Sequence, residues 1–104
     1  MKDTFLEELF NKLNSKLNDN SSVSYTAKLL KEPELLAKKI GEETTELIID
    51  FLKKNKEGVV HESADLIYHL LVLWVSTKVN PEDIWNELSS RKTKSGFEEK
   101  KSRT

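Results

Sequence analysis

The stretch KIGEETTELIIDFLKKNKEGVVHESADLIYH, Lys39–His69, contains a repeated arrangement of acidic residues around which the chain is organised. Glu43 and Glu46 are three positions apart, and Glu62 and Asp65 repeat this spacing further along. Side chains at this spacing lie on one face of an α-helix. If the two segments are antiparallel helices joined by a polar turn, the two pairs face each other. The stretch therefore predicts a helical hairpin with a cation site made of carboxylate oxygens.

The size and composition of the chain fit one helical domain. A chain of 104 residues buries one core, but a helical chain this small often shares apolar surface with a second copy. Only three Gly and two Pro favour helices over turn-rich β-structure. The lack of cysteine excludes disulfides and thiolate metal sites and is compatible with a cytoplasmic location. Charges interrupt the apolar residues of the N-terminus, so we expect neither a signal peptide nor a membrane span.

Charge is distributed unevenly along the chain. The net charge is −1, yet residues 1–88 are acidic in sum and residues 89–104 are basic. Scattered basic residues without interleaved aromatic residues are typical of a solvated terminus, so we expect no nucleic-acid partner. We divide the chain into a helical domain, residues 1–92, and a basic, irregular tail, residues 93–104, with Phe97 as its large apolar residue.

Apolar residues at helical spacing predict an all-α bundle of four to five helices. The first is expected from a capping box at Thr4 to about Leu17, and the others over residues 27–30, 33–54, 57–79 and 81–88. From Ser89 onward the helical pattern fades. The segment from Ala64 to Val79 is almost continuously apolar, so it must be covered on most sides. In so small a domain this cover is expected to include a partner chain, which predicts a homodimer.

Acid pairs at helical spacing arise easily by chance among 18 acidic residues, and most are solvated. Asp65 is more informative because it enters the most apolar segment, where an unpaired buried carboxylate is unfavourable. Two carboxylates about 5.5 Å apart repel by roughly 3 kcal/mol at an effective dielectric of about 20. Four converging acids therefore call for a cation, and oxygen ligands favour Mg²⁺ or Mn²⁺ over zinc. Gly41 lies inside this helical pattern, where glycine lowers helix stability by about 1 kcal/mol relative to alanine. A close approach of another backbone or a ligand would explain why glycine stands there.

A carboxylate-bound Mg²⁺ with open positions is a common means of engaging polyphosphates, and one acid can act as general base on water. The chain has no P-loop, no Ser-His-Asp order and no GxGxxG motif. His69, four positions after Asp65, is either a hydrogen-bonded core histidine or a substrate contact. The hydroxyl groups of Ser24, Tyr25 and Thr26 either cap a helix and line a rim or bind phosphate. The acids are alternatively the solvated face of a non-enzymatic helical dimerisation module.

Four segments resemble, in the same order and at similar spacing, the motifs of the phosphoribosyl-ATP pyrophosphatase family. They are SYTAKLL at 24–30, KKIGEETTE at 38–46, ESADLIYHLLVL at 62–73 and ELSSR at 87–91. The acid pattern alone is shared with the wider all-α nucleoside triphosphate pyrophosphohydrolases, the MazG-like and dimeric dUTPase-like enzymes. SYTA and ADLIYHLLVL are the more specific part, and the resemblance covers nearly the whole chain.

The resemblance implies a Mg²⁺-dependent, cytoplasmic, dimeric helical enzyme with a small-molecule substrate. Its reaction would be hydrolysis of phosphoribosyl-ATP to phosphoribosyl-AMP and pyrophosphate, the second step of histidine biosynthesis. The cyclohydrolase for the next step is then expected on a separate chain. A housecleaning pyrophosphatase acting on free nucleoside triphosphates is the alternative.

Carried over residue by residue, the resemblance also implies site residues. The implied metal ligands are Glu43, Glu46, Glu62 and Asp65. The implied base that orients or deprotonates water is Glu42 or Glu46. The residues implied to bind substrate or support the site are Ser24, Tyr25, Thr26, Lys39, Tyr68, His69 and Arg91. The division of roles among the three acids of one helical turn stays open. Departures from the family pattern at Pro33, Thr44, Thr45 and Ser63 affect local packing, and none removes an acid.

Overall fold

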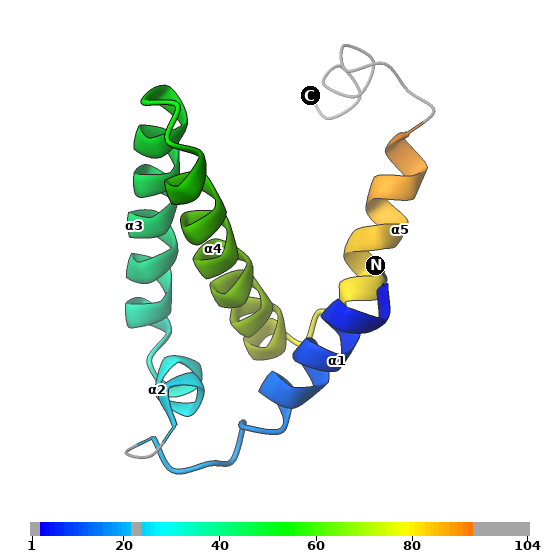
Figure 1. Ribbon diagram of the computed structural model, residues 1–104. Coiled ribbons are helices and arrows are strands. Elements are labelled where there is room, and N and C mark those ends of the chain that lie inside the picture. The colour runs from blue at the N-terminus through cyan, green and yellow to red at the C-terminus, as the bar shows by residue number, and fades with distance from the viewer. Residues whose placement is uncertain (1–2, 22–23, 93–104) are drawn as a thin grey trace.

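The computed structural model describes residues 3–21 and 24–92, and this part of the chain forms five helices (Figure 1). They are α1 (Asp3–Asn14), α2 (Tyr25–Lys31), α3 (Pro33–Leu52), α4 (Lys56–Thr77) and α5 (Pro81–Arg91). The predicted all-α class is confirmed for these residues. Among them, no helix combines the length and apolarity needed to cross a membrane.

The longest helices, α3 and α4, form the predicted hairpin (Figure 1). Pro33 is the first residue of α3, a position whose N–H has no partner within the helix, so the missing N–H of proline removes no hydrogen bond. After α3, Lys54 adopts a left-handed φ of 59°, and Asn55 caps α4 by accepting a hydrogen bond from the Gly58 N–H at 3.1 Å. The Asp50 carboxylate packs where a side chain at Gly58 would stand. The tight turn is therefore specified by local residues.

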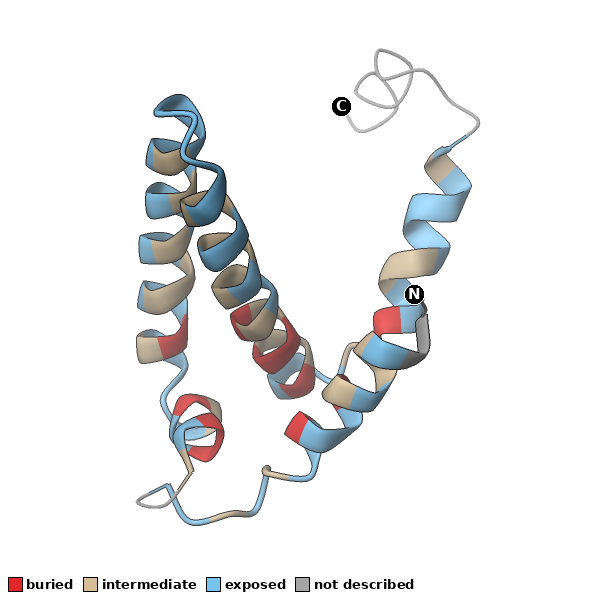
Figure 2. Ribbon diagram, in the orientation of Figure 1, coloured by how far each residue is buried: buried red, intermediate tan, exposed pale blue. Residues whose placement is uncertain are grey.

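The core lies at one end of the hairpin, where α1 and α2 pack against α4 (Figure 2). The buried apolar core residues are Phe10, Leu13, Leu29, Leu36, Leu71, Val72 and Val75. We call this end, residues 33–40 and 68–77, the hairpin base. We call the opposite end, residues 48–60, the hairpin tip. Phe51, Leu52 and Val60 at the tip are 67%, 71% and 70% exposed. One helix pair thus has a covered end and an uncovered end.

The helix ends near the chain termini differ from the prediction. Helix α1 ends at Asn14, three residues before Leu17, because the Lys16 and Leu17 N–H groups bond three residues back in tighter turns. The predicted fading after Leu88 was wrong, since α5 continues to Arg91. The Arg91 guanidinium lies 2.9 Å from the Glu87 carboxylate one turn earlier and supports this last turn. The predicted tail, residues 93–104, lies outside the described residues.

Helix α5 starts where the sequence predicted, at Asn80 and Pro81. Asn80 and Asp83 form a capping box, in which the Asn80 N–H donates to Asp83 Oδ2 at 3.0 Å. Figure 1 shows α5 leaning away from the hairpin; its start packs on α1, and Trp85 meets the Trp74 ring of α4 edge-on, with a centroid distance of 6.4 Å. Residues on α5 are therefore remote from the acids of α3 within one copy of the chain.

Candidate active site

Three of the four predicted metal ligands meet where α3 faces α4. Glu62 and Asp65 lie one turn apart on α4, and the Glu46 carboxylate of α3 lies close to that of Glu62. Glu62 Oε1 is buried and accepts no hydrogen bond. Burial raises the pKa of Glu62, and the charges of Glu46 and Asp65 raise it further. Among the neighbours that shift this pKa, only His61 lowers it, so a bound cation would add positive charge where carboxylates dominate.

His61 is a further potential ligand, which the sequence analysis did not single out. Its Nε2 lies 3.4 Å from Asp65 Oδ2, and the ligand atoms of His61, Glu62 and Asp65 lie within 4.8 Å of one another. The signal was available, because His61 precedes Asp65 by four positions and so shares its helix face. The His61 side chain is 73% exposed, which leaves the ring free to turn toward a cation.

The fourth predicted ligand, Glu43, lies against His69. Glu43 Oε1 is 2.7 Å from His69 Nδ1, and both side chains are largely buried. The ring N–H, however, is directed at the backbone carbonyl oxygen of Asp65, 2.8 Å away. Glu43 Oε1 therefore has a close polar neighbour but no well-aligned hydrogen bond. It is a second buried carboxylate oxygen that a cation would satisfy.

The hydroxyl groups of α2 lie against the same part of α4. Tyr25 Oη is 3.3 Å from His69 Nε2, and Thr26 Oγ1 is 2.7 Å from Tyr68 Oη. The two tyrosine rings stack with their centroids 6.3 Å apart. Burial raises the pKa of Tyr68 above its ordinary value near 10, so its phenol stays protonated at neutral pH. Four of the predicted substrate-binding residues thus form one cluster beside Glu43.

Three other predicted substrate-binding residues do not join this cluster. Ser24 Oγ accepts a hydrogen bond from the Ala27 N–H at 3.1 Å, so Ser24 acts as the cap of α2. Lys39 Nζ lies 3.9 Å from Glu42 on the solvent side of α3. Arg91 lies on α5, away from the hairpin (Figure 1). Within one chain, Ser24 therefore stabilises α2, and Lys39 and Arg91 lie outside the cluster of hydroxyl groups.

An open hollow of about 490 Å³ lies on the outer side of α3, beside the acids. It is lined by Lys38, Gly41, Glu42, Thr45, Glu46 and Ile49. The expected close approach to Gly41 is not made by the described chain, since nothing lies within 4 Å of where its Cβ would stand. Gly41 therefore widens a surface that adjoins Glu46.

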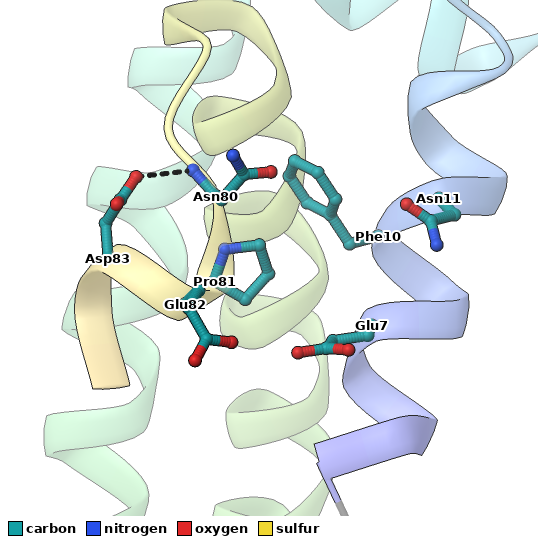
Figure 3. A pocket seen from close by; sticks show the side chains of 7 residues that line it. All are labelled: Glu7, Phe10, Asn11, Asn80, Pro81, Glu82 and Asp83. Atoms are coloured by element: carbon teal, nitrogen blue, oxygen red, sulfur yellow. Dashed lines mark hydrogen bonds between the residues drawn. The ribbon is translucent and has the colours of Figure 1, made fainter. Parts of the chain in front are cut away.

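A different hollow, of about 390 Å³, opens between α1 and the start of α5 (Figure 3). Glu7 and Glu82 face each other across it, and Asp83 is occupied by the capping bond to Asn80. Among the described residues no Lys or Arg lines it, so its acids would repel a polyphosphate. We place the candidate site at the acids between α3 and α4, where the buried oxygens Glu43 Oε1 and Glu62 Oε1 accept no aligned hydrogen bond and a cation would bind them.

A helical hairpin that joins carboxylates of both arms beside a group of hydroxyls defines an all-α protein suited to bind a cation with a polyphosphate. The family model described as phosphoribosyl-ATP pyrophosphohydrolase matches residues 6–92. The match covers all five helices apart from the first residues of α1.

Curated relatives agree with this match. The chain is 44% identical over 99 residues to the phosphoribosyl-ATP pyrophosphatase of Paramagnetospirillum magneticum, covering 94% of this chain and 91% of the relative. For the proteins of the same name from Gluconobacter oxydans and Azospirillum brasilense, identity is 38% and 36%, with 94% of this chain covered in each case and 74% and 89% of the relatives. The chain belongs to the phosphoribosyl-ATP pyrophosphohydrolase family. The predicted enzyme class, a hydrolase of a phosphoanhydride bond, is confirmed at the level of this family.

Proposed function

We propose that this chain hydrolyses phosphoribosyl-ATP between the α and β phosphates, yielding phosphoribosyl-AMP and pyrophosphate in the second step of histidine biosynthesis. The supporting observation is that a family match over residues 6–92 coincides with carboxylates of Glu46, Glu62 and Asp65 meeting across the hairpin. A cytoplasmic location belongs to the same proposal.

The residues present fit a divalent cation, which we propose to be Mg²⁺ or Mn²⁺. Glu43, Glu46, Glu62 and Asp65 would hold it, with His61 as an additional neighbour. The fit rests on the buried oxygens Glu43 Oε1 and Glu62 Oε1, which accept no aligned hydrogen bond. When bound, such a cation neutralises phosphate charge and lowers the pKa of a water.

Among the acids proposed to act on water, Glu46 is better placed than Glu42. Its carboxylate adjoins Glu62 at the meeting point of the two helices, whereas Glu42 lies beside Lys39 on the solvent side. A carboxylate held within reach of a bound water can accept its proton, which is the task of a general base. Glu46 would therefore orient and deprotonate the attacking water, and Lys39, whose Nζ lies 3.9 Å from Glu42, would bind phosphate.

A second copy of the chain is part of the proposal. The hairpin tip carries exposed apolar side chains around an open hollow of about 480 Å³, lined by Phe51, Lys54, Lys56, Val59 and Val60. Contiguous apolar surface on a small protein commonly marks an interface. A homodimer that covers the tip would give this end of the hairpin the protection that α1 and α2 give the base.

Pyrophosphate release from phosphoribosyl-ATP, dUTP, dCTP and ITP, measured side by side with Mg²⁺, tests this function. We expect phosphoribosyl-ATP to be preferred and Asp65→Asn to reduce its turnover by about 100-fold or more. Glu57→Gln is the matched control, since Glu57 is an exposed acid in the first turn of the same helix. Its turnover should equal that of the parent chain.

Other outcomes identify the alternatives. Preference for a free nucleotide would indicate a housecleaning pyrophosphatase. A chain that hydrolyses none of the four substrates, and whose thermal stability does not respond to Mg²⁺, would be a helical dimerisation module with solvated acids.

A further inference from the structure

His69 is a buried ring that touches three helices at once. It belongs to α4 and is 5% exposed. Its Nδ1 lies 2.7 Å from Glu43 Oε1 of α3, and its Nε2 lies 3.3 Å from Tyr25 Oη of α2. The two ring nitrogens thus face a predicted metal ligand on one side and a predicted substrate-binding hydroxyl on the other.

The hydrogen bonds around the ring have a defined direction. The backbone carbonyl oxygen of Asp65, 2.8 Å from Nδ1, can only accept, so Nδ1 carries the hydrogen. Nε2 of the neutral ring then presents its lone pair, and the Tyr25 hydroxyl donates to it. The donor direction therefore runs from Tyr25 through the ring to the Asp65 carbonyl, and Glu43 Oε1 lies 2.7 Å from the same nitrogen, Nδ1. A change in the hydrogen bonding of the Tyr25 hydroxyl therefore alters the polarisation of His69 at Nδ1.

The ring has little freedom to turn. The Tyr68 ring stands nearly perpendicular to it with a centroid distance of 4.9 Å, and Tyr25 makes a second edge contact at 6.1 Å. Tyr25 itself is 47% exposed, so it is the member of this chain of contacts that a ligand reaches. Nε2 is occupied by Tyr25, which leaves His69 behind the site and not in contact with substrate.

We propose that His69 is a positioning residue that couples the Tyr25 hydroxyl to the Glu43 carboxylate. The coupling links the substrate side of the site, on α2, to its metal side, on α3. Its role in catalysis rests on the proposed function, whereas the coupling itself is a property of the folded chain. Substrate contact at Tyr25 then favours the Glu43 position that holds the cation, so cation and substrate bind cooperatively.

A double-mutant cycle in the absence of metal tests the coupling directly. Urea unfolding is measured for Tyr25→Phe, Glu43→Gln and the double variant, at one fixed protein concentration. The same cycle is then repeated in a His69→Leu background, where a buried apolar side chain fills the site. We expect a coupling of roughly threefold or more in the unfolding equilibrium constant with His69 and none with His69→Leu. Equal coupling in both backgrounds, or none in either, would overturn the proposal.

Calorimetric titration with Mg²⁺ supplies a second readout. Tyr25→Phe is expected to weaken Mg²⁺ binding by roughly two- to tenfold through His69, although the hydroxyl does not touch the acids. Thr77→Val is the matched control, because the Thr77 hydroxyl bonds the Leu73 carbonyl of its own helix, eight positions beyond His69 and outside the cluster. It should leave the Mg²⁺ affinity unchanged, and a loss equal to that of Tyr25→Phe would contradict a specific path through His69.

Two substitutions of His69 separate positioning from mere packing. His69→Asn retains a donor near the place of Nδ1 and loses the acceptor for Tyr25, so its main expected effect is a raised KM. His69→Gln places its amide near Nε2 and loses the neighbour of Glu43, so its main expected effect is a lowered kcat. Indistinguishable kinetics would contradict the proposal. Metal-free coupling in a chain that hydrolyses no phosphoribosyl-ATP would refute the proposed function alone, whereas hydrolysis without coupling would refute this inference alone.

Discussion

The base and the tip of the α3–α4 hairpin are built from the same two helices, yet their apolar residues have opposite surroundings (Figure 2). At the base, Leu71 and Val72 are 1% and 0% exposed under α1 and α2. At the tip, Leu52 and Val60 are 71% and 70% exposed. Apolarity alone therefore does not define the core. Cover by other helices does, and the described chain has enough helix to cover only one end.

The candidate metal ligands lie between these two regions. Glu62 is partly sealed, with one buried oxygen, while Glu46 stays exposed. A site at the border of the core combines rigid support from the base with access from the open side. The following experiments alter one end of the hairpin at a time.

The largest expected difference comes from the same substitution at the two ends. Leu71→Ala should lower the free energy of unfolding by about 2–5 kcal/mol, because it leaves a cavity in the core. Leu52→Ala should lower it by less than about 0.5 kcal/mol at concentrations where the chain is monomeric. Urea unfolding measures both. Equal losses would show that the tip is covered as fully as the base.

The second prediction concerns association through the tip. Phe51→Glu places a charge among exposed apolar side chains and should halve the mass measured by light scattering without loss of helical circular dichroism. Leu88→Glu, an equally drastic change on the exposed side of α5, is the control and should leave the mass unchanged. A parent chain that is monomeric at micromolar concentration would contradict the dimer.

The third prediction concerns acid crowding at Glu62. Its folded-state pKa is raised above the ordinary 4.5, so ionisation destabilises the folded state. The contribution of Glu62 to the stability of the parent chain should fall as pH rises from 4.5 through the folded-state pKa and stay lower above it. Glu62→Gln should therefore be the more stable chain at neutral pH, with the gain lost below about pH 4.5. Thermal unfolding across pH measures this, and a constant gain at every pH would exclude charge repulsion as its cause.

The smallest predicted effect is at Gly41. Gly41→Ala should stabilise the metal-free monomer by up to about 1 kcal/mol, because the position is helical and open. If the hollow beside Gly41 receives substrate or a second copy, the same methyl group should weaken that binding. Turnover and unfolding measured together decide this, and a variant that improves both would show that the hollow has no partner.

Helix starts were predictable because their causes are local. Pro33 and the pair Asn80-Pro81 act through their own backbone geometry and through bonds to residues within one turn. The cap at Asn55 was not predicted, and α4 begins one residue before the expected residue 57. Helix ends were less predictable. The last turn of α5, up to Arg91, contains an ion pair with Glu87, which the spacing of apolar residues does not predict.

The candidate site was predictable in part for the same reason. The spacing of Glu62 and Asp65 placed them on one face of α4, and Glu46 followed once the hairpin was expected. The capping role of Ser24 was one of two readings that the sequence left open. The place of Glu43 against His69 was not among the expectations, because it depends on how α3 and α4 pack against each other.

The amino-acid sequence by itself determined the helices, the hairpin and the family, since each depends on residues close in the chain or on motifs in a set order. Only the tertiary structure decided that Glu46 lies close to Glu62 and that Glu43 lies against His69. Spacing along a helix sets the face on which a side chain lies but not the partner that it meets there. His69 joins Tyr25 to Glu43 across gaps of 44 and 26 positions, and such a contact exists only after the three helices have packed.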